Sequence, residues 1–335
     1  MELNKATLSD FTALADVIFV KELMSLPREA RDSGLFKVVP IPDNTGESRK
    51  FSEIDLEEYA EVKNESDQAS RAKVQQGYYK TMSVKRFAKD IGISYEMRKF
   101  NKYPEVVARL TNLARLAVAR MELDLQHRIG FAASTSYTNK DGETVATTTG
   151  DGKALAYSAH TLAGSSTTYR NILANNPQLS RGALEAMELM RVQNTYNQFG
   201  EKVVMPADIL WTTDDPNTIN TAREYLKSTA SPDATHAGVT NVYAGKYQHK
   251  ILSRVATTAA GANDSTKAKY WGLASSSYST AYLGIWEEPH LKTPADLNAG
   301  EDFPTDDWNY GVRAGWGIEI LNGAWFGMSK GDGSA

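Results

Sequence analysis

The feature that most constrains the fold is one long amphipathic helix, predicted over residues 102–129. Pro104 and Glu105 mark its first turn, and Gly130 supplies a stop signal. At 1.5 Å per residue such a helix spans roughly 40 Å, so it predicts the spine of an elongated molecule. The apolar residues that recur at helical spacing, and that we expect to form its buried face, are Val106, Val107, Leu110, Leu113, Ala117, Met121 and Leu125.

Two different segments precede this helix. Residues 3–26 have the apolar spacing of a short amphipathic helix, which Pro27 ends. We expect its apolar residues Phe11, Leu14, Ile18 and Phe19 to contact a neighbouring subunit, because no covering surface is evident in the same chain. A long two-stranded ribbon follows, with an outgoing arm near 51–62 and a polar tip at 63–67. The ribbon is too polar to be core.

The ribbon divides by charge. Residues 47–71 hold four bases and eight acids, a net of 4 − 8 = −4, and residues 72–102 hold eight bases and two acids, a net of 8 − 2 = +6. Opposite charges can pair across the two strands of one ribbon. Alternatively, the acidic half of one subunit reaches the basic half of a neighbour. The residues that we expect to make this intersubunit contact are Glu57, Glu58, Glu61, Lys63, Asn64, Glu65 and Asp67.

A mixed region follows the long helix. Ser180 is the N-cap of a second predicted helix that continues to Gly200, and Asp215-Pro216 begins a third. Turn signals at 139–142 and 321–324 each predict a hairpin. The remaining strands are predicted at 203–205, 209–211, 251–255, 270–273 and 282–286.

Composition excludes several classes of protein. The 335-residue chain has a formal net charge of −4, which argues against broad binding of nucleic-acid phosphates. It contains no cysteine, so disulfides, thiolate nucleophiles and cysteine-rich zinc sites are excluded. Neither a secretion signal nor a membrane-spanning segment is indicated, and the cytoplasm is the expected site of synthesis.

Catalytic motifs are weak. The sequence at 150–154 lacks the spacing and hydroxyl of a phosphate-binding loop and is interpreted as a surface turn. The five histidines lack the spacing of a zinc protease, and no metal or cofactor is expected. Glu287-Glu288 and Asp306-Asp307 could serve as the paired carboxylates of a carbohydrate hydrolase, although adjacent acids on exposed turns are far commoner.

The order of these elements resembles the Hong Kong 97-type capsid fold of tailed phages. The branch that it resembles most is the Mu-like major head subunits. The resemblance is carried by Asp151-Gly152-Lys153-Ala154-Leu155 followed by His160, by Tyr169-Arg170-Asn171, by Leu179-Ser180, and by the stretch from Gly200 to Trp211. The stretch from Trp211 to Pro216 departs from Mu-like relatives, which have a more apolar run there.

This resemblance implies an α+β fold in five parts. They are an N-arm at 1–33, an extended E-loop hairpin at 34–95, a P-domain at 96–178 with the spine helix at 102–129, an A-domain at 179–285, and a return to P-domain strands at 286–335. It implies a structural major capsid protein that assembles with itself, as hexamers and pentamers, into an icosahedral shell around double-stranded DNA. Scaffold, portal and possibly decoration proteins are the other implied partners.

Two other functions stay open. An encapsulin-like bacterial compartment has the same fold and cages enzymes in place of DNA, and a carbohydrate hydrolase would use the carboxylates named above. The leading hypothesis places the protein in the virion capsid after assembly in the host cytoplasm. It assigns the chain no catalytic residue and no membrane contact.

Overall fold

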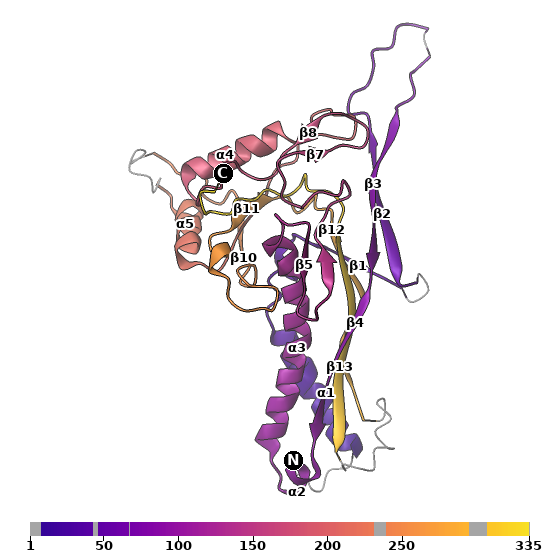
Figure 1. The fold of residues 1–335 in the computed structure, drawn as a ribbon, viewed down its shortest axis with the longest axis vertical. Coiled ribbons are helices and arrows are strands. Elements are labelled where there is room, and N and C mark those ends of the chain that lie inside the picture. Colours follow the sequence, from indigo (N-terminus) through magenta and orange to yellow (C-terminus); the bar gives the residue numbers. More distant parts are fainter. Residues whose placement is uncertain (1–7, 43–45, 67, 231–238, 295–306, 335) are drawn as a thin grey trace.

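The computed structural model describes residues 8–42, 46–66, 68–230, 239–294 and 307–334. The molecule is elongated, and its longest helix and longest strands run side by side along the long axis (Figure 1). A mixed α/β region lies toward one end, and a two-stranded ribbon rises beside it. The fold is α+β, as predicted.

A four-stranded sheet runs along the length of the molecule. Its strand order is β1 (Lys37–Pro40), β12 (Ala281–Lys292), β13 (Trp308–Ile320) and β4 (Lys85–Ile93). β1 is parallel to β12, and the other neighbours are antiparallel. The long sheet therefore joins segments from both ends of the chain.

The predicted spine helix is α3 (Tyr103–Gly130), one residue later at each end than predicted. Six of its seven predicted core residues are buried, but Val107 is half-exposed because it lies at the edge of the buried stripe. α3 packs against the long sheet, and α1 (Leu8–Ser25) packs against α3. The short α2 (Tyr95–Lys99) and the 3-10 turn η1 (Arg31–Ser33) complete this half.

The mixed region is built on a small sheet of order β10 (Gln248–Ile251), β9 (Ile209–Thr212) and β11 (Trp271–Ala274). The helices α4 (Arg181–Gln193) and α5 (Pro216–Lys227) begin at the predicted caps. Ser180 Oγ accepts a hydrogen bond from Ala183 N at 3.2 Å, and Asp215 Oδ2 accepts one from Thr218 N at 2.9 Å. A 3-10 turn, η4, spans Ser265–Lys267.

The ribbon is formed by β2 (Ser48–Leu56) and β3 (Val74–Ser83). It is shorter than the predicted 34–95, because β1 and β4 pair into the long sheet and leave only 48–83 as a hairpin. The turn signal at 139–142 is confirmed, since β5 (Ser136–Thr138) pairs with β6 (Thr144–Ala146). A further small pair is β7 (His160–Thr161) with β8 (Thr168–Tyr169).

Four local predictions were wrong, one of them the strand at 251–255, because the structure has β10 at Gln248–Ile251 and a turn at 253–256. α4 ends at Gln193, before Gly200, because the side chains of Asn194 and Thr195 donate hydrogen bonds to the carbonyl oxygens of Met190 and Arg191 in its last turn. Residues 203–205 are not a strand, since no described strand lies beside them. The turn at 321–324 does not form the predicted hairpin, because the chain that follows it does not pair with β13. The chain continues to β11, where Gly327 N donates to Leu273 O at 2.8 Å.

Candidate assembly surfaces

One face of the ribbon is bound to its own subunit by polar contacts. Glu53 accepts hydrogen bonds from Asn322 Nδ2 at 2.7 Å and from Gln198 Nε2 at 2.8 Å. Asp55 Oδ2 accepts from the backbone N–H of Gln198 at 2.9 Å. Farther out, Glu201 Oε2 accepts from the backbone N–H of Glu58 at 2.8 Å. The ribbon thus docks on the mixed region and on the turn after β13.

The carboxyl of Glu53 has an unusual environment. Burial raises the pKa of Glu53 to about 7, and the nearby charge of Asp55 acts in the same direction. The hydrogen bonds from Asn322 and Gln198 oppose this rise only in part. Docking of the ribbon is therefore coupled to protonation of the Glu53 carboxyl near neutral pH.

The base of the ribbon lies closely on the long sheet. Gly284 and Gly317 are cross-strand partners in β12 and β13, and the buried Met82 covers them. A Cβ built on Gly317 would collide with the carbonyl oxygen of Ser83, and one built on Gly284 would collide with the Met82 side chain. Phe51 stacks on Tyr282 nearby, with ring centroids 4.1 Å apart. Only glycines permit this close approach.

The opposite face of the ribbon is apolar and exposed. Side chains alternate between the faces of a strand, so Glu53 and Asp55 point toward the subunit while Ile54 and Leu56 point away from it. Ile54 is 64% exposed and Leu56 is 58% exposed, and Val74, directly opposite Leu56, is 62% exposed. Contiguous exposed apolar surface of this kind marks an interaction site.

Six of the seven predicted E-loop contact residues lie in the tip, which we define as residues 57–66; the seventh, Asp67, lies outside the described residues. Glu57 pairs with Lys73 of the same ribbon, at 2.9 Å between Oε1 and Nζ. That hydrogen bond lowers the pKa of Glu57. Glu58, Glu61, Lys63, Asn64 and Glu65 are exposed. Pairing within the ribbon therefore accounts for Glu57, and the other acids face solvent.

The position of the N-terminal helix α1 differs from the prediction that its apolar residues contact a neighbouring subunit. Phe11 and Phe19, predicted to contact a neighbour, are buried against α3 and the long sheet of their own subunit. The physical reason is that the flank of α3 offers an apolar surface to α1 within the same chain. Leu14 and Ile18 are half-buried, while Val17 and Met24 are exposed on the outer side of the helix.

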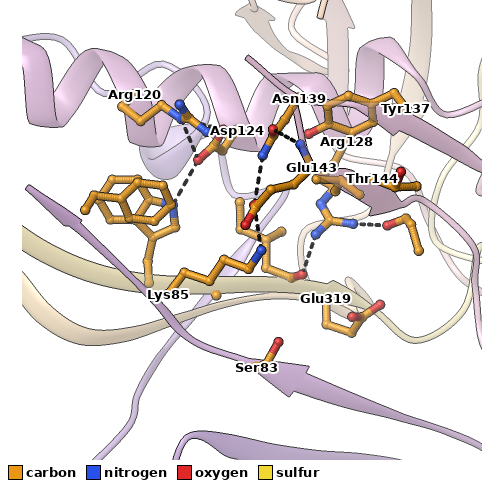
Figure 2. A pocket seen from close by; sticks show the side chains of 16 residues that line it. Ser83, Lys85, Arg120, Asp124, Arg128, Tyr137, Asn139, Glu143, Thr144 and Glu319 are labelled. Atoms are coloured by element: carbon orange, nitrogen blue, oxygen red, sulfur yellow. Dashed lines mark hydrogen bonds and ion pairs between the residues drawn. The ribbon is translucent and has the colours of Figure 1, made fainter. Parts of the chain in front are cut away.

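A pocket between α3, β4, β13 and the β5–β6 hairpin is lined by sixteen residues, six of them charged, and several of the charged groups bind one another (Figure 2). Lys85 Nζ lies 2.6 Å from Glu143 Oε2, and Arg120 binds Asp124 at 3.0 Å. Arg128 donates to the carbonyl oxygen of Ile318 at 2.9 Å. These contacts tie the hairpin to the spine helix and the sheet, which is a structural role.

Two of the four candidate catalytic carboxylates, Glu287 and Glu288, lie against basic side chains. Arg31 donates to both carboxylate oxygens of Glu288, at 3.0 and 2.6 Å, and His290 Nε2 lies 3.3 Å from Glu287. Asp306 lies outside the described residues. Among the residues that are described, no cluster of three or more His, Asp or Glu side chains could hold a metal ion. No described helix has the length and apolarity needed to span a membrane.

Residues 150–154 are not the simple surface turn that was predicted. Asp151 Oδ2 lies 2.9 Å from Nδ1 of the buried His160, and Asp151 Oδ1 accepts from Thr149 Oγ1 at 2.6 Å. Burial opposes ionisation of Asp151, but the bonds from His160 and Thr149 outweigh it and lower its pKa to about 2. His160 also stacks on Tyr169. This network supports the segment beneath the ribbon.

A comparison with protein families decides the class. The model of a family described as phage capsid protein matches residues 78–329, which is more than half of the chain. The chain belongs to this family. It is a structural capsid protein of the virion, and no curated protein matched it.

Several solved structures are similar to this chain, and the first of them supports the fold. The capsid of Ralstonia phage GP4 matches with a TM-score of 0.50 at 13% identity, covering 89% of this chain and 87% of that one. A virus-like particle from Pyrococcus furiosus matches with a TM-score of 0.48 at 11% identity, covering 95% and 98%. The procapsid of bacteriophage JBD30 has a TM-score of 0.44 at 12% identity, covering 97% and 76%. This capsid protein has the Hong Kong 97-type fold.

Sequence reasoning missed the contacts that dock the ribbon of this capsid protein. Glu53, Gln198 and Asn322 come from three distant segments, so no local pattern brings them together. The alternation of Glu53 and Asp55 with Ile54 and Leu56 was the available signal, because it gives the ribbon two unlike faces.

Proposed function

We propose that the chain is a shell subunit of a Mu-like tailed phage, which forms hexamers and pentamers and encloses double-stranded DNA without sequence-specific binding. Scaffold, portal and possibly decoration proteins are its further partners, and assembly takes place in the host cytoplasm. The subunit acts without catalysis or a cofactor. In this arrangement the ribbon is the E-loop, which lies over the P-domain of a neighbouring subunit.

The observation that carries this proposal is the exposed apolar face of the ribbon. Ile54, Leu56 and Val74 turn away from their own subunit, whereas the acidic face is occupied by Gln198 and Asn322. A ribbon with one face bound to its own subunit and the other face exposed is suited to contact a neighbouring subunit. In a closed shell, that contact is repeated at every equivalent subunit interface.

The parts of the subunit follow from the elements. We assign residues 1–33 to the N-arm, 48–83 to the E-loop, and α3 with the long sheet to the P-domain. The A-domain then comprises residues 179–280, and β12, β13 and the C-terminal segment return to the P-domain. The A-domain boundary rests on the small β10-β9-β11 sheet, which has its own core around Leu184, Leu210 and Trp271.

The Mu-like assignment is supported by the residues quoted above from 151–160, 169–171 and 200–211. An encapsulin-like compartment has less support, because the matched family is one of phage capsid proteins. The hydrolase alternative has less support too, since Glu288 is neutralised by Arg31.

Oxidative footprinting tests the proposed contact. Leu56, Val74 and Tyr79 should react readily with hydroxyl radicals in the free subunit and at least about fivefold more slowly in assembled shells, since burial removes them from solvent. Reactivity at Lys63 reports on the tip of the ribbon. Leu189, which is exposed on α4, serves as the internal reference. Equal reactivity of Leu56 in both states would refute the contact through this face.

A further inference from the structure

We propose that a basic groove beside the spine helix binds the phosphate backbone of the enclosed double-stranded DNA. The groove lies between α3, β4, the β5–β6 hairpin and the loop after β10. The inference rests on the proposed function and deepens it, because it names the surface that faces the shell interior and the ligand that this surface binds. The charged residues that line the groove are Arg86, Lys89, Arg120, Lys140, Arg254 and Asp141.

The groove is basic although the chain is acidic. Five bases and one acid line the groove, a net of 5 − 1 = +4, whereas the whole chain holds 37 bases and 41 acids, a net of 37 − 41 = −4. The composition of the chain therefore does not account for the positive charge of the groove. Lysine and arginine gathered on one surface are the electrostatic footprint of a contact with nucleic acid.

Three of these cations have no acidic partner. Lys89, Lys140 and Arg254 form no ion pair with any residue that the structure describes. Asp141, the acid that lines the groove, is neutralised by Arg120, at 2.7 Å between Oδ2 and Nη2. A cation without a nearby acid can bind a phosphate oxygen without first breaking an ion pair. The groove therefore offers three charges to an anionic ligand.

The spine helix fixes the segments that carry the cations. The ion pair of Asp141 ties the β5–β6 turn, which carries Lys140, to α3. The backbone N–H of Arg254 donates to Gln126 Oε1 of α3 at 2.5 Å, which anchors the loop after β10. Segments that are distant in the sequence thus present their cations along one rigid helix. The site is preformed, so a ligand does not have to order these loops on binding.

The groove and the ribbon lie on opposite faces of the long sheet. Trp316 of β13 faces α3, since its Nε1 donates to Asp124 at 3.3 Å. The next residue, Gly317, faces the ribbon, since a Cβ there would collide with the ribbon backbone. Lys89 lies on the α3 face, because side chains alternate along a strand and Phe87 of the same strand stacks on Trp316.

This position favours DNA over a protein partner. Under the proposed function the ribbons lie over neighbouring subunits and therefore occupy the ribbon face of the sheet. A closed shell has one outer and one inner face, so the α3 face is the one directed to the interior. The polyanion enclosed there is DNA, which carries one negative charge for about every 1.7 Å of its axis. Three cations in each subunit bind it weakly, but the contact is repeated over the whole shell.

Binding of short duplex DNA to the free subunit tests the site. Fluorescence anisotropy gives the affinity between about 50 and 200 mM salt, where each phosphate contact adds about −0.9 to the slope of log K against log salt. The variant with Lys89→Gln, Lys140→Gln and Arg254→Gln should bind at least about tenfold more weakly, with a slope smaller by roughly 3 × 0.9 = 2.7. The variant with Lys89→Arg, Lys140→Arg and Arg254→Lys keeps the charges and should bind like the unmodified chain.

A control variant removes the same charge outside the groove. Lys99→Gln, Lys202→Gln and Lys227→Gln, all at exposed positions, should leave the affinity and the salt slope nearly unchanged. Equal weakening by both triple variants, or no weakening by the groove variant, would overturn the site. Polyglutamate that displaced the DNA at equal charge concentration would assign the groove to an acidic protein segment and would overturn the choice of DNA.

Thiol labelling of assembled shells tests the direction that the groove faces. The chain has no cysteine, so Lys140→Cys provides a single thiol at an exposed position. A small maleimide, which can diffuse into a shell, should label both the free subunit and the shell. A maleimide attached to a large polymer should label only the free subunit.

The outcomes separate this inference from the proposed function. Labelling of intact shells by the polymer reagent would place the groove outside, and loss of labelling by both reagents would show that another protein segment covers it. Either result would overturn the DNA contact and leave the shell function intact. If the unmodified chain formed no shell under any condition, the proposed function itself would fail, while the DNA titration of the free subunit would still decide the site.

Discussion

Asn322 Nδ2 donates a hydrogen bond to Glu53 Oε1 at 2.7 Å, so a single carboxyl joins the ribbon to the turn that follows the last strand of the long sheet. The same carboxyl binds Gln198 of the mixed region. Its pKa of about 7 means that the docked ribbon holds a proton more tightly than a released ribbon does. The position of the ribbon should therefore respond to pH.

The first prediction gives that response its sign. The docked state raises the pKa of Glu53 from 4.5 to about 7. Below pH 4.5 the carboxyl is protonated in both states, so its ionisation adds no free-energy cost to docking. This cost grows as pH rises and is complete above about pH 7. Amide hydrogen exchange in residues 74–82, corrected for intrinsic rates, should accelerate between pH 5 and pH 8 by at least about tenfold, which corresponds to one pKa unit or more.

The variant Glu53→Gln tests the cause. It keeps the hydrogen-bonding shape but cannot ionise, so exchange in the ribbon should lose most of this pH dependence. Glu58→Gln, on the exposed tip, is the control and should behave like the unmodified chain. Identical pH profiles for the Glu53→Gln variant and the unmodified chain would show that another group is responsible.

A second prediction concerns the glycine pair beneath the ribbon. Gly317→Ala places a Cβ against the carbonyl oxygen of Ser83, and the resulting overpacking should cost about 1–3 kcal/mol in the free energy of unfolding. Denaturant titration of the isolated subunit measures this cost. Gly182→Ala is the control, because a Cβ there meets nothing within 4 Å and improves helix propensity. Equal stability of the two variants would contradict the close approach.

A third prediction tests the spine. Leu110 is fully buried on α3, so Leu110→Asp puts an unpaired charge in the core and should destabilise the subunit by roughly 4 kcal/mol or more. Little soluble subunit should be recovered. Asn112→Asp introduces the same side chain on the exposed face of the helix and should be recovered normally. Normal recovery and unchanged melting of the Leu110→Asp variant would rule out this core face.

A fourth prediction separates the two interpretations of the N-terminal helix. Phe19→Ala should lower the stability of the unassembled subunit by about 3–5 kcal/mol, because Phe19 is buried against α3 of the same chain. Val17→Ala removes an exposed side chain and should change the stability of the unassembled subunit little. If Phe19→Ala impaired assembly but left the melting of the free subunit unchanged, Phe19 would belong to an intersubunit contact after all.

The sequence predicted those parts of the fold whose signals are local. The 3.6-residue spacing around Leu110 placed the spine to within one residue at each end, and Ser180 and Asp215 gave the starts of two helices. It could not predict that β1 and β4 pair with β12 and β13, because their partners lie more than 200 residues away. For the same reason the ribbon was predicted too long.

The candidate contact surfaces were less accessible to sequence reasoning. Phe19 and Ile54 are both apolar residues in amphipathic segments, yet Phe19 is buried within its own subunit and Ile54 is exposed. Only tertiary packing distinguishes them, since α3 covers Phe19 while nothing described in the same chain covers Ile54. Charge patterning correctly indicated an acidic tip, but it could not show that Glu57 pairs with Lys73.

Electron microscopy of the chain, produced with and without the proposed scaffold partner, tests the central claim most directly. We predict closed icosahedral shells whose hexamers and pentamers are copies of this chain, and aberrant particles when the scaffold is left out. A preparation that stays monomeric at every protein concentration, with and without scaffold, would contradict the account.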